Sequence, residues 1–265
     1  MKLFYRQYGS GDPIVILHGL FGLSDNWVSF ARAISGSFNV IVPDLRNHGQ
    51  SPHSPLFNFP SMEDDLMELI DDLGLGESIL IGHSLGGKVV MGFALKHPEI
   101  VKKLVVADIS LRSYSGNREH QHLLNAMLRA DLGAARSRSD VERQLAADVP
   151  DVRLRQFLMK NVYWRERDKL DWRPDLHAID ENLPSVFDGV VEAGTYGGPA
   201  LFVRGGLSNY VTDEDIIPIR AKFPGAVVTT IANASHWVHA DSPGEFLSIV
   251  SSFLLGGSVP RDGDL

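Results

Sequence analysis

The fold of this chain is decided by the stretch SILIGHSLGGK, residues 78–88. It opens with four apolar or small residues, a pattern typical of a strand buried on both faces, and residues 88–96 then read as a helix. Between them lies the pattern Gly-x-Ser-x-Gly, whose tight strand-to-helix turn needs glycine two residues before and two residues after the serine. Such a turn lifts the hydroxyl of Ser84 above the sheet at a helix N-terminus, where developing negative charge is favoured. Ser84 is therefore the predicted nucleophile.

Short apolar runs that alternate with helical patterns extend outward from this stretch. Several runs are apolar throughout, as expected of central strands in a parallel sheet. The predicted fold class is therefore α/β, with a mostly parallel central sheet and helices on both faces. The predicted strands are Leu3–Tyr8, Ile14–Leu17, Asn39–Val42, Ser78–Ile81, Lys103–Ala107, Ala200–Arg204 and Val227–Ile231.

This alternation stops between about Ile109 and Gly198, where no convincing strand is found. Helix-like segments occur there at 119–130, 140–147 and 152–163. We interpret residues 110–198 as a helical cap inserted in the second half of a core that comprises residues 1–109 and 199–255. Residues 256–265 are rich in Gly, Pro and Asp and are predicted to form a flexible tail.

Composition excludes several kinds of function. The formal net charge is −8, which disfavours nucleic acid and anionic membrane surfaces as partners. The 265 residues include no cysteine, so disulfides and thiolate metal sites are absent. The N-terminus lacks the apolar segment of a signal peptide, and no apolar run is long enough to span a membrane. A cytoplasmic protein is therefore expected.

Four motifs together resemble the α/β-hydrolases, most closely the YbfF-type bacterial esterases and their mitochondrial relatives. They are HGLFG at 18–22, PDLRNHGQS at 43–51, GHSLGG at 82–87 and ASHWVH at 234–239. The resemblance covers nearly the whole chain and is weakest in the cap. It implies a serine esterase with a Ser-His-Asp triad that needs no metal or cofactor.

Two amides and one histidine are expected beside Ser84. The backbone N–H of Leu85 should provide one oxyanion donor, because it directly follows the nucleophile. The resemblance assigns the second donor to Leu20 in the loop after the Ile14–Leu17 strand, with Phe21 as the alternative. The histidine follows the last strand in this fold. His236 is therefore the predicted base, with His239 as the alternative.

The acid of the triad departs from the majority pattern. Its usual place follows the Ala200–Arg204 strand, near Ser208, where no charged residue occurs. Asp108 directly follows the Lys103–Ala107 strand, and YbfF-type enzymes place their acid there. Asp108 is therefore the predicted acid, with Asp213 as the alternative.

Aromatic and histidine side chains beside the catalytic positions are candidates for substrate contacts. The predicted set is Phe21, His83, Tyr210 and Trp237. The expected function is hydrolysis of short-to-medium acyl esters of small molecules. Acyltransferase and thioesterase activities share the same triad, and a slow or non-catalytic ligand receptor is the alternative from another class. The oligomeric state is left open.

Overall fold

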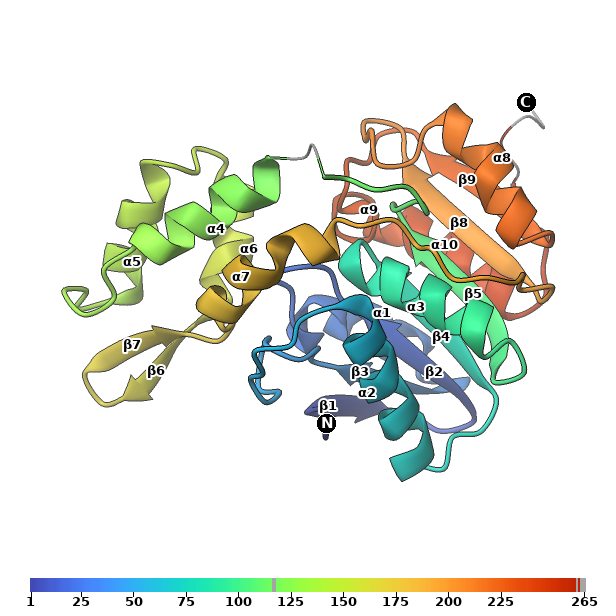
Figure 1. The fold of residues 1–265 in the computed structure, drawn as a ribbon, viewed down its shortest axis with the longest axis horizontal. Helices are drawn as coiled ribbons and strands as arrows, with labels where there is room; N and C mark the ends of the chain where they lie inside the picture. Colours follow the sequence, from blue (N-terminus) through green and yellow to red (C-terminus); the bar gives the residue numbers. More distant parts are fainter. Residues whose placement is uncertain (116–117, 261, 263–265) are drawn as a thin grey trace.

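A seven-stranded sheet forms the centre of the protein in a computed structural model that describes residues 1–115, 118–260 and 262. Its spatial order is β1-β3-β2-β4-β5-β8-β9, and only β1 runs antiparallel to its neighbour. All seven predicted strands occur, and the fold class is confirmed (Figure 1). Their bounds are β1 Tyr5–Tyr8, β2 Asp12–Leu17, β3 Phe38–Pro43, β4 Ser78–His83, β5 Val101–Ala107, β8 Ala200–Gly205 and β9 Ala226–Ile231.

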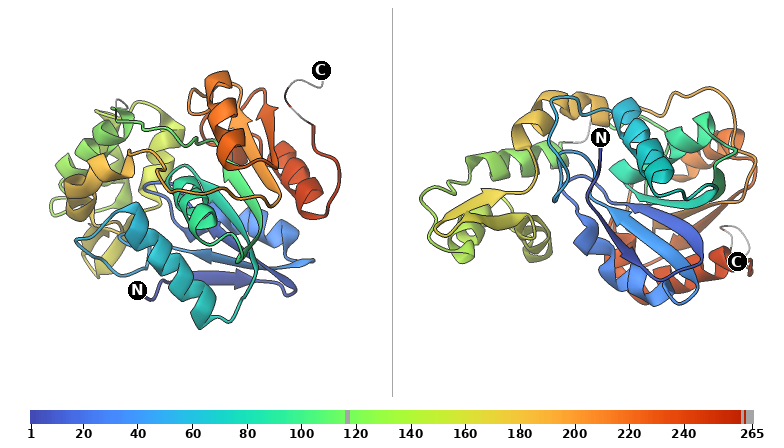
Figure 2. Two further views of the ribbon diagram at one scale, coloured as in Figure 1. Left: turned by 45° about the vertical axis from the view of Figure 1, so that its right-hand side comes forward. Right: turned by 90° about the horizontal axis from the view of Figure 1, so that it is seen from below.

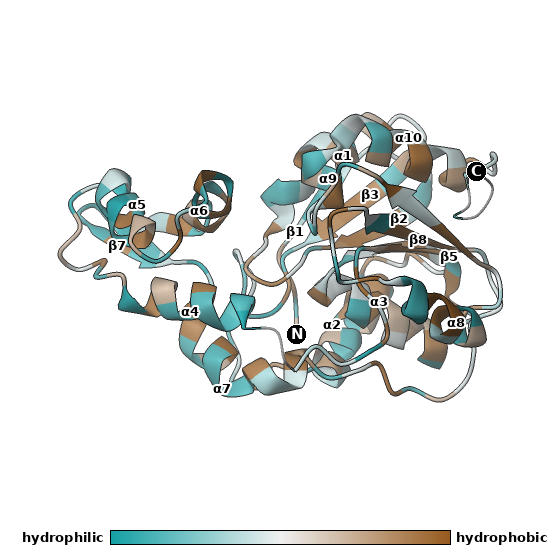
Figure 3. Cartoon of the chain, turned by 90° about the horizontal axis from the view of Figure 1, so that it is seen from above, coloured by the Kyte–Doolittle hydropathy of each residue, from teal (hydrophilic) through white to brown (hydrophobic). Residues whose placement is uncertain are grey.

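Helices cover both faces of this sheet, because alternate residues of each central strand point to opposite sides. Val15, Leu80 and Val106 pack in the cluster shared with one set of helices: α2 Phe59–Asp72, α3 Leu85–Lys96 and α8 Asp213–Lys222. Ile14 and Val105 face the other set: α1 Val28–Ile34, α9 Val238–Asp241 and α10 Pro243–Leu254. Figure 3 shows that hydrophobic colouring is concentrated on strands such as β8 and on the helix faces turned toward the sheet.

Residues 119–186 lie to one side of the sheet and project from it (Figures 1 and 2), whereas Tyr196 is buried against the core and donates its hydroxyl to the Val101 carbonyl at 3.1 Å. Residues 110–198 are called the insertion below. Its helices are α4 Glu119–Arg129, α5 Arg138–Ala146, α6 Val152–Met159 and α7 Leu176–Val186. The expectation of no strand here is wrong. An antiparallel hairpin of β6 Val162–Glu166 and β7 Lys169–Trp172 takes up the end of the segment predicted as a helix over 152–163.

The two segments that connect the insertion to the core are hydrogen-bonded to each other. The Tyr114 amide donates to the Phe187 carbonyl at 2.7 Å, and the Val190 amide donates to the Leu111 carbonyl at 2.8 Å. The Lys88 ammonium of α3 donates to the carbonyls of Arg112 and Asp188, each at 2.5 Å. These bonds hold both connecting segments against α3, the helix that follows Ser84.

The described part of the predicted tail contacts the core at Asp262. Asp262 donates its amide to the Val228 carbonyl at 3.0 Å, and its carboxylate accepts from Arg204 at 2.9 Å. The predicted tail residues 261 and 263–265 lie outside the described residues. In the described part of the chain, no helix is both long and apolar enough to cross a membrane.

Candidate active site

Ser84 occupies a strained turn between β4 and α3. Its backbone has φ +52° and ψ −117°, a region that side-chain-bearing residues rarely adopt. A Cβ at position 82 would lie 2.3 Å from the Gly86 carbonyl oxygen, and a Cβ at position 86 would lie 2.5 Å from that of Leu17. Glycine at both positions is what lets the turn close and place Ser84 at the start of α3.

His236 and Asp108 are in direct contact. The loop after β9 brings Nδ1 of His236 to 2.9 Å from Oδ2 of Asp108, which follows β5. Asp108 is fully buried and has φ +49°, a conformation that aspartate tolerates better than most residues. Because His236 donates from Nδ1, its Nε2 is left to accept a proton, and Nε2 has no hydrogen-bond partner among the described residues.

Ser208, which stands near the usual place of the acid, donates a hydrogen bond to Asp108 instead. The Ser208 hydroxyl donates to Oδ2 of Asp108, and the Gly205 amide donates to Oδ1 at 2.8 Å. Asp213, the alternative acid, has a side chain that is 86% exposed and pairs with Arg204 at 2.7 Å. Between these two aspartates, Asp108 is the one in contact with the imidazole of His236.

Burial changes the pKa of both partners. It lowers the pKa of His236 to about 3, against the opposing effect of Asp108, so the imidazole is neutral near pH 7 and can act as a base. Burial also raises the pKa of Asp108 to about 7, and the hydrogen bonds from Ser208 and Gly205 oppose this rise. These two donors and His236 surround the carboxylate and favour its ionised form.

The loop after β2 is held from two sides at Phe21. Its amide donates to Nε2 of the buried His48 at 3.1 Å, and its carbonyl accepts from Nδ2 of Asn161 in the insertion at 2.7 Å. The Phe21 amide, the alternative oxyanion donor, is therefore already engaged. The amides of Leu20 and Leu85 have no hydrogen-bond partner within the described residues, which leaves both able to bind an oxyanion.

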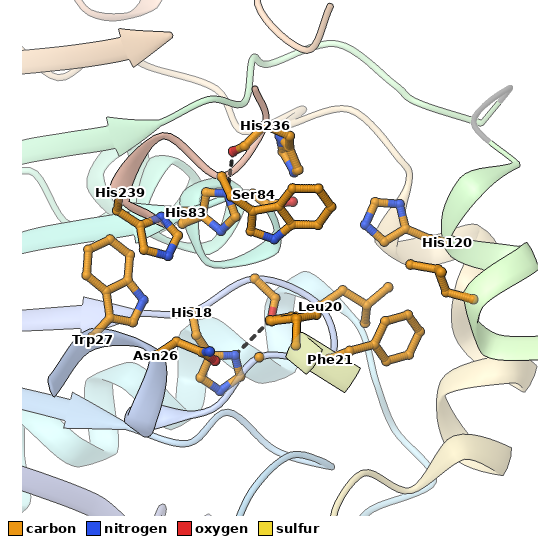
Figure 4. Close-up of a pocket in the computed structure, with 15 residues that line it drawn as sticks. His18, Leu20, Phe21, Asn26, Trp27, His83, Ser84, His120, His236 and His239 are labelled. Carbon is orange, nitrogen blue, oxygen red and sulfur yellow. Dashed lines mark hydrogen bonds between the residues drawn. The ribbon is translucent and has the colours of Figure 1, made fainter. Parts of the chain in front are cut away.

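Two pockets share Ser84. The first, called the His236 pocket, is lined by His236 and by the predicted contacts Phe21, His83 and Trp237 (Figure 4). The second, called the Lys88 pocket, is lined by Lys88 and by the fourth predicted contact, Tyr210. The Tyr210 ring also stacks on His236, with centroids 3.7 Å apart.

Several lining residues were missed by the sequence reasoning. His120 of α4 lines both pockets, and its ring lies edge-on to His236 with centroids 6.5 Å apart. Trp27 and His239 line the His236 pocket, whereas Tyr114 and Phe187 line the Lys88 pocket. No spacing rule marks these positions. Only His239 had a signal, its place in the loop after the last strand.

The described residues contain no group of three or more histidine or acidic side chains placed to hold a metal ion. Two buried histidines, His18 and His83, are instead hydrogen-bonded to backbone carbonyls. Nδ1 of His18 donates to the Gly19 carbonyl at 2.8 Å, and Nε2 of His83 donates to the His236 carbonyl at 2.9 Å. These rings support the loops that hold the site.

Comparison with known proteins gives matches over most of the chain. Residues 12–164 match the family described as the alpha/beta hydrolase fold. The sn-1-specific diacylglycerol lipase ABHD11 of Danio rerio is 38% identical, over 93% of this chain and 80% of the relative. Esterase YbfF of Escherichia coli (strain K12) is 33% identical, over 92% of this chain and 94% of the relative. A solved structure described as a marine microorganism esterase has a TM-score of 0.93 and 39% identity, covering 96% of this chain and 99% of that chain. The resemblance inferred from the four motifs is confirmed.

Proposed function

Because this chain belongs to the α/β-hydrolase family and is an esterase- or lipase-type enzyme acting on ester bonds, we propose that it cleaves carboxylic esters through a Ser84–His236–Asp108 triad. The reaction passes through a covalent acyl-enzyme. The observation that carries this proposal is the 2.9 Å contact between His236 and Asp108 beside the strained turn of Ser84.

The proposed mechanism uses the neutral imidazole twice. Nε2 of His236 takes the proton of the Ser84 hydroxyl as the oxygen attacks the ester carbonyl, and Asp108 stabilises the imidazolium that forms. The amides of Leu20 and Leu85 bind the oxyanion. His236 then protonates the leaving alcohol, and the same base activates a water molecule that releases the acid from Ser84.

The two pockets take different parts of the ester. The leaving alcohol must receive its proton from His236, which lines the His236 pocket but not the Lys88 pocket. The alcohol part therefore occupies the His236 pocket and the acyl chain occupies the Lys88 pocket. Ile109, Val186 and Phe187 give the Lys88 pocket an apolar wall that suits an acyl chain.

The test is turnover of p-nitrophenyl esters from acetyl to dodecanoyl. We expect the highest kcat/KM at short-to-medium chains and a loss of at least about 10³-fold in Ser84→Ala, since removal of a triad nucleophile leaves only binding and oxyanion stabilisation. Ser78→Ala is the matched control, because this buried serine begins the same strand and lines neither pocket. An unreactive wild-type protein that a fluorophosphonate also fails to label at Ser84 would contradict the proposal and favour a non-catalytic receptor.

Three finer points remain predictions: hydrolysis rather than acyl transfer, a preference for oxygen esters over thioesters, and the cytoplasmic location. Transfer of the acyl group to an added alcohol, measured as new ester formed against free acid, would favour an acyltransferase over a hydrolase. Faster cleavage of thioesters than of the matched oxygen esters would favour a thioesterase. The cytoplasmic location is tested by fractionation of cells that express the chain.

A further inference from the structure

Two buried nitrogen atoms at one end of the His236 pocket lack a partner. Trp27 is fully buried, and its indole Nε1 makes no hydrogen bond among the described residues. The same holds for Nδ1 of His239. Both residues line the His236 pocket, and Figure 4 shows them together at the end away from His120, with Ser84 between the two ends.

Packing fixes both rings in place. The indole of Trp27 and the imidazole of His239 are stacked, with centroids 4.2 Å apart and planes at 10°. Phe30 and Phe246 pack against Trp27 at 5.6 and 6.0 Å, and His83 packs against His239 at 4.8 Å. The unpaired nitrogens therefore belong to packed rings that are not free to turn and find partners.

Proteins seldom leave a buried donor without an acceptor, because the lost hydrogen bonds to water are not replaced. Two such atoms on adjoining rings of the pocket that contains the nucleophile indicate a position where a ligand supplies the missing partner. Asn26 lines the same pocket and has its carbonyl oxygen engaged by the Leu23 amide at 2.8 Å, so its free NH₂ adds a further donor.

The chemistry of these atoms selects the ligand group. An indole N–H can only donate. Burial lowers the pKa of His239 well below its ordinary value, so the ring is neutral and Nδ1 can accept in one of its tautomers. A hydroxyl can accept from Trp27 and donate to His239 at the same time. A carboxylate cannot donate, and an alkyl group leaves both atoms unpaired.

We propose that Trp27 and His239 form a hydroxyl-binding subsite for the alcohol part of the substrate, so that the preferred substrates are monoesters of diols or polyols that keep a free hydroxyl. This inference rests on the proposed function, in which His236 protonates the alcohol and so places it in the His236 pocket. The apolar Lys88 pocket then holds the acyl chain.

The test compares esters that differ by one hydroxyl. The pairs are 2-hydroxyethyl with propyl butyrate, 3-hydroxypropyl with butyl butyrate, and 4-hydroxybutyl with pentyl butyrate, which are matched in length. We expect kcat/KM to be about fivefold higher for the hydroxylated member of at least one pair, as one added hydrogen bond implies. Trp27→Phe, which keeps a ring and removes the N–H, should reduce that ratio to within about twofold of one.

His239→Phe is a second route to the same result, because it keeps a stacking ring and removes Nδ1. Trp172→Phe is the matched control, because it removes an indole N–H from a residue that lines neither pocket, and it should keep the preference for the hydroxylated ester. Equal rates within all three pairs for the wild-type enzyme would overturn the subsite and mean that only water binds there. No hydrolysis of any ester would instead count against the proposed function.

Discussion

At the scale of single residues, the site depends on Asp108 being held by its neighbours. The carboxylate accepts from the Gly205 amide, the Ser208 hydroxyl and Nδ1 of His236 while fully buried. Ser208 stands where the majority of related enzymes would place the acid itself. The Ser208 hydroxyl is one of the three donors that hold Asp108. Position 208 therefore contributes to the site without supplying the carboxylate.

Asp108→Asn should lower kcat by about 10⁴-fold with little loss of structure, because the amide cannot hold the imidazole in the required tautomer or stabilise its charged form. The measurement is kcat on p-nitrophenyl butyrate together with a circular dichroism spectrum. Asp213→Asn is the matched control and should retain kcat within about twofold, since its exposed pair with Arg204 is weak. A larger loss in Asp213→Asn than in Asp108→Asn would reverse the assignment of the acid.

At the scale of elements, the insertion contacts the loop that presents the oxyanion donor. Asn161 is fully buried just before β6, and it donates to the Phe21 carbonyl at 2.7 Å. Phe21 has φ +60°, a strained value for a side-chain-bearing residue, and its amide is bound to His48. Phe21, which directly follows Leu20, is thus held at its amide by a bond from the core and at its carbonyl by a bond from the insertion.

Asn161→Ala should lower kcat by about 10-fold with a smaller change in KM. Loss of the bond at the Phe21 carbonyl lets the Leu20 amide move from its place. The enzyme then loses part of the 10²- to 10³-fold increase in kcat that one oxyanion donor contributes. Steady-state kinetics on p-nitrophenyl butyrate measures the split between kcat and KM. Asn182→Ala is the control, because its amide links α7 to the Pro55 carbonyl away from both pockets. A pure rise in KM would show that Asn161 acts on substrate binding instead.

At the scale of the whole molecule, buried neutral histidines should make stability depend on pH. Burial lowers the pKa of His18 to about 4 and of His48, His120 and His236 to about 3, and it lowers the pKa of His83 and His239 well below 6.5. In the unfolded chain these rings bind protons below pH 6.5, whereas in the folded protein they do not. Unfolding then takes up protons, so the free energy of unfolding falls as the pH drops below 6.5.

Two buried carboxyls oppose this effect. Burial raises the pKa of Glu63 and of Asp108 to about 7, so below pH 7 the folded protein binds these two protons more tightly than the unfolded chain. The larger number of histidines dominates, and each net proton contributes about 1.4 kcal/mol per pH unit. Urea unfolding should therefore show a marked loss of stability between pH 6.5 and 5. A flat free energy of unfolding over this range would contradict the prediction.

Sequence reasoning succeeded where local patterns carry the information. Short strand-like runs, several of them apolar throughout, located all seven strands of the sheet. The glycines around Ser84 predicted its turn because a Cβ at either position would collide with backbone. The β6–β7 hairpin was missed because its alternation is interrupted by charged residues at 165–169, and strand pairing is not visible in one segment.

The other pocket residues could not be predicted from the sequence, because tertiary packing brings them to the site. His120 and Trp27 reach the pocket from α4 and from the short 3₁₀ helix Ser24–Trp27, two elements far apart in the chain. Nothing in the residues around them distinguishes a pocket wall from ordinary core.

The two hydrogen-bonded segments at the base of the insertion have a consequence for how enzymes of this kind diversify. The proposed triad and both oxyanion amides come from loops of the core, whereas Tyr114, His120 and Phe187 of the pocket walls come from the insertion. Replacement of the part of the insertion between these two segments would therefore change the substrate specificity while leaving the catalytic residues unchanged. The hydrogen bond from Asn161 to the Phe21 carbonyl sets the condition, because a transplanted segment without an equivalent donor would alter the substrate range and weaken the chemistry together.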